Sequence, residues 1–474
     1  MQPTLRTEFR TKLVTSSAVS SIVTSIRASA RSLAAAGVAL GAVFGLPSLT
    51  AASAPAAQKA TAEQKSIQDR ELNGAAKLFA SYEEAKRINK GSYEVQADLE
   101  KEFGKVGKKL GGDGKSPDAL LAHPWSLARA VWLSADYEGK ASKQRKEFGK
   151  VTERTTEGGT KLALWVPGKY RPKDGPYPLL LCIADEGVKP EQHIMEDWVD
   201  GSIRDSFLIA TPEMPGNASL WLDTDGIKSV MFALRDVRNN YAIDFDQIFI
   251  GGRGRGVETA HAIAARFPDQ FAGVFGWAGD ANGDVQPENF RNIPCYFAGG
   301  GTKATAFKKA CEDLKLGSVT LKQDGKSVDI ADWAKTVRRS PYPDEVSLVQ
   351  KNGSPTNCYW ITVARVDAER VAIDAKVDRA TNTITIEAEG LDAATIYLND
   401  ALVDLDKTVT IIANGAETKF TESRNMSFAL ELFMLGRNDG GRFFVAQRAV
   451  SIPARETSAD EKKDDGKGSL DAGR

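Results

Sequence analysis

The feature that most constrains the fold is a regular alternation of strand-like and helix-like segments between residues 145 and 337. Short apolar runs, typical of strands covered on both faces, occupy 179–184, 207–212, 247–252 and 293–299. Amphipathic segments with helical spacing lie between or after them, at 226–241, 257–267 and 305–316. This alternation predicts a parallel sheet with helices on both faces, within a domain that we place at 145–340.

The segments on either side of this domain have different patterns. Residues 57–144 are helical in character, with a break at 111–117 (GGDGKSP). Residues 341–453 show period-two strands alone, and Asn414-Gly415 is a strong signal for a two-residue hairpin. We therefore predict an N-terminal helical region and a C-terminal antiparallel β-sandwich. The charged segment 454–474 is predicted to be disordered.

The first 56 residues have the pattern of an export signal. Five basic residues and a single acid precede an apolar run at 33–46, and small residues follow it. The run is short and rich in glycine and alanine, so we expect no membrane span in the mature chain. We expect cleavage after Ala52 or Ala56 and a periplasmic or extracellular protein. The alternative is an uncleaved anchor with an alanine- and serine-rich start.

Composition excludes several classes of protein. Lys and Arg number 62 against 63 Asp and Glu, so broad electrostatic nucleic-acid binding is not expected. The only histidines are His123, His193 and His261, which argues against a multi-histidine metal site, and no cofactor is expected. The four cysteines, Cys182, Cys295, Cys311 and Cys358, are compatible either with disulfides or with buried thiols.

A strand–turn–helix segment carries the main functional clue. Residues 246–280 read DQIFIGGRGRGVETAHAIAARFPDQFAGVFGWAGD, in which a strand leads into a glycine-rich turn and then a helix. This segment resembles the nucleophile elbow of α/β-hydrolases, especially the secreted esterase and polyhydroxyalkanoate-depolymerase-like group. The helix end at 266–272 (RFPDQFA) and the flanking strands fit the same group, and the resemblance covers roughly 150–340. It implies an α/β-hydrolase-like domain and an esterase-like ancestry.

The residues that this chemistry needs are missing. Gly254 stands where the nucleophilic serine belongs, between Gly252 and Gly256, and a shift of one residue puts Arg253 or Arg255 there. The oxyanion loop carries Asp185 and Glu186, whose negative charges would oppose an oxyanion.

The other two members of the catalytic triad are missing as well. Residues 300–302 supply no acid, and no histidine follows residue 261. Since no base can then activate a hydroxyl, the sequence predicts no catalytic residue at this turn.

Several alternatives stay open for the turn. Arg253 and Arg255 favour an anion, or they pair with Asp185 and Glu186 across the crevice and plug the old site, which is the interpretation we favour. A dinucleotide fingerprint fails because Thr259 replaces the third glycine. Trp221, in a predicted loop, is a further candidate for lining a pocket.

The histidines allow two weaker interpretations. His193 and Glu196 lie three apart and form either half of a metal site or a solvated helix face. His261 is expected to be a satisfied, half-buried residue.

Three hypotheses about function follow. The first is an exported, non-catalytic protein with this fold that binds an unidentified ligand or an envelope partner. The second is an active hydrolase that uses unfamiliar residues, for instance Asp185 as a nucleophile. The third is a structural envelope protein.

Overall fold

The computed structural model describes residues 67–215, 222–351, 353–366 and 370–454. The predicted export signal, Trp221 and the predicted tail beyond residue 454 lie outside the described residues. Everything described belongs to one compact unit that begins at Lys65. Within this part of the chain, no helix is long and apolar enough to cross a membrane.

The first elements are helical. Gln68 precedes the first helix, where it forms a capping box with Glu71, and His123 precedes Pro124 at the start of another helix. These helices are α2 (Asp69–Arg87), α3 (Ser92–Gly107), α4 (Asp118–Leu121), α5 (Pro124–Ser134) and α6 (Tyr137–Gln144), with short 3-10 turns η1 (Lys108–Leu110) and η2 (Arg145–Glu147).

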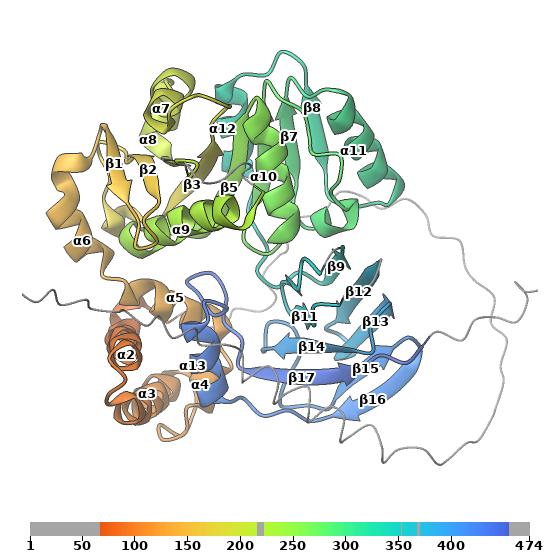
Figure 1. Cartoon of the computed structure of the whole chain (residues 1–474). Coiled ribbons are helices and arrows are strands. Elements are labelled where there is room, and N and C mark those ends of the chain that lie inside the picture. The colour runs from red at the N-terminus through yellow and green to blue at the C-terminus, as the bar shows by residue number, and fades with distance from the viewer. Residues whose placement is uncertain (1–66, 216–221, 352, 367–369, 455–474) are drawn as a thin grey trace, which may run out of the picture. The chain divides into compact units, whose positions relative to one another are not determined.

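An eight-stranded sheet follows (Figure 1). Its strands are β1 (Val151–Thr155), β2 (Lys161–Trp165), β3 (Tyr177–Ile183), β4 (Leu208–Pro212), β5 (Ile243–Arg253), β6 (Gly273–Trp277), β7 (Cys295–Ala298) and β8 (Val319–Lys322). Their spatial order is β1-β2-β4-β3-β5-β6-β7-β8. The pairs β1–β2 and β2–β4 are antiparallel, and every pair from β4 to β8 is parallel. The parallel sheet predicted from the alternation of segments is confirmed.

Helices cover both faces of this sheet, because alternate residues of its strands point to opposite sides. Leu179 and Leu181 pack in one core with helices α9, α10 and α11, whereas Leu180 and Cys182 pack in a second core with α7, α8 and α12. These helices are α7 (Pro190–Asp197), α8 (Gly201–Ser206), α9 (Thr224–Asn240), α10 (Arg255–Arg266), α11 (Thr302–Asp313) and α12 (Ser327–Thr336), with 3-10 turns η3 (Pro172–Asp174) and η4 (Pro287–Phe290). This part of the chain is therefore an α/β domain, a mixed sheet with helices on both faces.

The C-terminal part forms two sheets. One has the order β10-β11-β14-β17 and the other β16-β15-β13-β12-β9. Their strands are β9 (Glu345–Gln350), β10 (Asn357–Cys358), β11 (Ile361–Val363), β12 (Val371–Asp378), β13 (Thr383–Glu389), β14 (Ala393–Leu398), β15 (Val409–Ala413), β16 (Ala416–Phe420) and β17 (Ala446–Ser451). All pairs are antiparallel except β13–β15. Asn414 and Gly415 both have positive φ and form the expected two-residue hairpin.

The expectation of strands alone in this region is wrong at one place. Helix α13 (Met426–Met434) interrupts the strands, and the side chain of Asn425 caps it by accepting the N–H of Phe428 at 2.9 Å. Its residues Ala429 and Leu430 are buried in one core with helices α2 to α5 and the sandwich. The sequence of α13 has no clear helical or strand periodicity, so its burial in the core determines that it is a helix.

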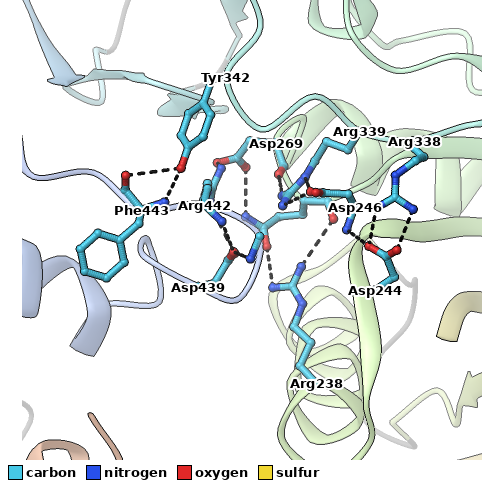
Figure 2. A network of polar contacts seen from close by, with 12 residues as sticks. Arg238, Asp244, Asp246, Asp269, Arg338, Arg339, Tyr342, Asp439, Arg442 and Phe443 are labelled. Carbon is cyan, nitrogen blue, oxygen red and sulfur yellow. Dashed lines mark hydrogen bonds and ion pairs between the residues drawn. The ribbon is translucent and has the colours of Figure 1, made fainter. Parts of the chain in front are cut away.

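The sandwich meets the α/β domain through a buried network of charged groups (Figure 2). Arg442 donates to Asp269 Oδ2 at 2.7 Å, and both side chains are at most 4% exposed. Arg339 pairs with Asp246 at 2.9 Å and donates to the Asp269 carbonyl at 2.6 Å. Burial alone would raise the pKa of Asp269, yet the guanidinium of Arg442 holds it below its ordinary value.

Candidate functional site

The glycine-rich turn at 252–256, called the elbow below, has the backbone that a nucleophile position requires. Strand β5 ends at Arg253, helix α10 begins at Arg255, and Gly254 between them has φ 53° and ψ −124°. Its N–H donates to the carbonyl of Trp277 on the neighbouring strand β6 at 3.1 Å. The strained turn geometry of a nucleophile elbow is therefore present without a side chain at its tip.

The two flanking glycines allow the helix to pack directly against the sheet. A Cβ on Gly256 would lie 2.3 Å from the carbonyl oxygen of Ile183, and one on Gly252 would lie 2.4 Å from the backbone of Gly256. Both distances are far below van der Waals contact, so only glycine fits.

The carboxylate of Asp185 occupies the space in front of the elbow. A Cβ built on Gly254 would lie 2.1 Å from Asp185 Oδ2. The other oxygen, Oδ1, accepts the N–H of Arg255 at 2.9 Å and that of Glu186 at 2.9 Å. An oxyanion hole is made of these two kinds of amide: one follows the nucleophile position and the other lies in the loop after strand β3. The side chain of Asp185 fills the place where an oxyanion would bind.

The two elbow arginines have different partners. Arg255 forms an ion pair with Glu186 at 2.5 Å, and both side chains are largely exposed. Arg253 does not pair with Asp185 as the sequence interpretation expects, because it pairs with the buried carboxylate of Asp197 at 2.5 Å. Its guanidinium also lies 5.2 Å from the ring centroid of Trp277. The structure brings Asp185, Glu186 and Arg255 together and directs Arg253 toward α7.

Helix α7 contributes the buried residue His193. The sequence interpretation that His193 lies on a solvated helix face is therefore wrong. His193 is 1% exposed, and its Nδ1 lies 2.7 Å from Asp197 Oδ2. Trp198 Nε1 donates to His193 Nε2 at 3.3 Å, which makes Nε2 the acceptor and leaves Nδ1 to donate to Asp197. The sequence pattern did not single out Asp197, although the four-residue spacing from His193 to Asp197 was a usable signal.

The buried pair cannot serve as a catalytic base at the elbow. Both ring nitrogens of His193 are used, one by Asp197 and the other by Trp198. The second oxygen of Asp197 is held by Arg253. The contacts from α7 to the elbow therefore hold two buried side chains, His193 and Asp197, which have no access to a substrate.

The other candidate nucleophiles and bases are also buried. His261 is completely buried, not half-buried as expected, with Nδ1 accepting the N–H of Asn282 at 3.1 Å and no partner for Nε2. Burial lowers the pKa of His261 to about 3. Burial also raises the pKa of the Cys182 thiol, and all four cysteines are free and buried.

The carboxylate nearest to the acid position has a structural role. Asp280, which follows β6, accepts N–H groups from residues 281, 301, 303 and 304, and so caps the start of α11. Although burial acts in the opposite direction, these amides lower its pKa. Residues 300–302, where the sequence resemblance places the catalytic acid, are Gly300, Gly301 and Thr302.

Comparisons with known proteins add the following. No protein-family model matches the chain. No curated protein matches it either. A thermostable esterase of known structure is similar over 41% of this chain and 64% of its own, with 17% identity and a TM-score of 0.34. The chain thus spans just under two thirds of that esterase.

Two further solved structures are similar over smaller parts of this chain. A ferulic acid esterase is similar over 39% of this chain and 92% of its own, with 13% identity and a TM-score of 0.30. An S-formylglutathione hydrolase from Staphylococcus aureus is similar over 39% of this chain and 94% of its own, with 10% identity and a TM-score of 0.31. Fold does not fix function, so the function of this chain is argued from its own residues.

Proposed function

We propose that this chain is an exported protein with an α/β-hydrolase fold that has lost catalysis and acts by binding a ligand or an envelope partner. One observation carries the proposal: the Asp185 carboxylate accepts the Arg255 and Glu186 amides in front of a side-chain-free elbow. A fixed negative charge at this point opposes the oxyanion that ester hydrolysis must form. A missing serine alone would leave the hole open, whereas here it is also filled.

The alternative of Asp185 as a nucleophile has less support. A nucleophilic carboxylate needs a free lone pair aimed at substrate and a base that activates water in the second step. The two amides bind Asp185 Oδ1 and leave Oδ2 facing the elbow, but the histidines that could activate water, His193 and His261, are buried away from solvent.

The proposal is tested with a fluorophosphonate probe and with p-nitrophenyl butyrate, next to an active serine esterase as a positive control. We expect no labelling of the chain and no turnover above that of its heat-denatured form. Stoichiometric labelling, or turnover that disappears in Asp185→Asn, would overturn the loss of catalysis.

The export part of the proposal needs a separate experiment. Expression of the full chain in a bacterial host is expected to give a mature N-terminus at residue 53 or 57 in the exported fraction. A chain that keeps its first 56 residues in the cytosol contradicts the export proposal.

A further inference from the structure

A cavity of about 430 Å³ lies at the far end of α10 from the elbow. Its lining includes the last turns of α10, the loop after β6, and the segment after β9 of the sandwich. Helix α10 has 12 residues, which puts the two ends about 16 Å apart. The cavity therefore does not belong to the elbow, and the contact between α/β domain and sandwich is a common location for ligand sites.

One part of the cavity lining is aliphatic and lies beside a buried hydrogen-bonded asparagine. Ile227, Ile263 and Val285 supply aliphatic surface. Asn289, which is 4% exposed, clamps the sandwich strand beside them. Its Oδ1 accepts the Val349 N–H at 2.7 Å and its Nδ2 donates to the Val349 carbonyl at 3.0 Å. A wall with its polar groups already paired does not have to rearrange when a ligand binds.

The rim is charged and unpaired. Arg266 and Lys351 both line the cavity and are exposed, and neither forms an ion pair with any residue that the structure describes. Asp284 is the one acid among the described lining residues. The negative charge of Asp284 also acts on Lys303, which lies outside the cavity. The pKa of Lys303 is raised, mainly by Glu258 and to a smaller extent by acids that include Asp284.

From this arrangement we infer that the cavity binds a small organic acid with an aliphatic body, of about the size of octanoate. The aliphatic wall takes the chain, and Arg266 with Lys351 hold the carboxylate at the rim. The volume equals that of roughly 14 water molecules in the liquid, enough for such an acid with some water retained. The inference rests on the proposed binding function and names the ligand class.

Calorimetric titration of the exported chain with octanoate tests it. We expect saturable one-site binding, and we expect Arg266→Gln and Lys351→Gln each to weaken it by up to about fivefold, as loss of an exposed ion pair does. Lys173→Gln, which removes an exposed lysine far along the chain, is the matched control and should leave the affinity unchanged.

Two further measurements separate the charge from the cavity. Octan-1-ol should bind more weakly than octanoate and equally to all these variants, because it has no charge. Ala262→Phe places a ring in the cavity and should abolish octanoate binding while the thermal midpoint is kept.

The inference is overturned if octanoate fails to saturate the chain. It is also overturned if octanoate binds Ala262→Phe, Arg266→Gln and Lys351→Gln as tightly as it binds the parent chain. That failure leaves the elbow result untouched. Labelling by the fluorophosphonate would instead overturn the proposed loss of catalysis while octanoate binding persisted.

Discussion

At the residue scale, a glycine and a carboxylate together determine the state of the elbow. Gly254 keeps the strained backbone but has no Cβ, and the space that a serine would use is occupied by the Asp185 carboxylate. The N–H of Arg255, at the start of α10, donates to this carboxylate. The site is thus closed by an internal ligand, and this can be tested directly.

Removal of that carboxylate should leave two amide N–H groups free to donate to an added carboxylate. We expect Asp185→Ala to lower the free energy of unfolding by about 1–2 kcal/mol, the usual effect of losing a helix cap. Acetate should restore part of the loss in thermal midpoint in this variant, by mass action. Glu186→Ala, which breaks only an exposed pair, is the control, and an equal acetate effect there would contradict the assignment.

His261 makes a second prediction at this scale. Burial lowers the pKa of His261 to about 3 in the folded chain. In the unfolded chain the same imidazole binds a proton near pH 6.5, so between these two pH values only the unfolded chain is protonated at this residue. The contribution to stability is therefore full above pH 6.5 and falls as pH decreases through this window. At pH 4.5 the loss is about 2–3 kcal/mol.

Urea unfolding at pH 7 and pH 4.5 measures this effect. His261→Gln should reduce the fall in unfolding free energy between the two pH values by about that amount. His123→Gln, at a partly buried histidine, serves as the control. A parent chain and a His261→Gln variant with the same pH dependence would show that this ring does not titrate as stated.

At the element scale, short polar signals decide where helices begin. Helix α13 escaped the sequence analysis because its nine residues are apolar nearly all round, and it lies between strands. The cap at Asn425 and burial against Phe79, whose ring lies 5.3 Å from that of Phe433, hold it in place.

Loss of this cap should be measurable. We expect Asn425→Ala to reduce the free energy of unfolding by about 1 kcal/mol, since the Phe428 N–H loses its acceptor. Ser427→Ala, at an exposed position in the first turn of the helix, is the comparison. A cost for Asn425→Ala no larger than that for Ser427→Ala would mean that the side-chain cap does not stabilise α13.

At the scale of the whole molecule, the N-terminal helices and the sandwich share one core although some 200 residues separate them. The α/β domain is joined to the sandwich by the buried pair of Arg442 and Asp269 (Figure 2). Removing one partner of a buried ion pair is costly, because the remaining charge is left in the interior without a counter-ion or solvent.

Removal of one partner of this pair should destabilise the whole unit. We expect Asp269→Asn or Arg442→Met to cost about 3–5 kcal/mol each, with the double variant costing clearly less than their sum. Urea unfolding followed by tryptophan fluorescence and by far-ultraviolet circular dichroism measures this. Strictly additive costs would show that the two groups do not interact in solution.

The sequence by itself determined the local parts of this protein. Apolar runs and amphipathic periods predicted the parallel sheet, most of its helices and the Asn414-Gly415 hairpin, because these depend on neighbours along the chain. Strands β1 and β8 were not predicted, since edge strands bury few residues and carry weak patterns. Helix α12 was not predicted either, because only three of its ten residues are buried. The absence of a serine at residue 254 and of a histidine after 261 could also be read directly.

Only the tertiary structure decided which charged groups meet. The sequence placed four charged residues on facing loops: Asp185, Glu186, Arg253 and Arg255. It did not show that Arg253 pairs with Asp197 or that Asp185 accepts the elbow amides. It also could not show the cavity beside Lys351. Ion pairs and cavities depend on distances of a few ångström between segments far apart in the chain, and no local pattern encodes them.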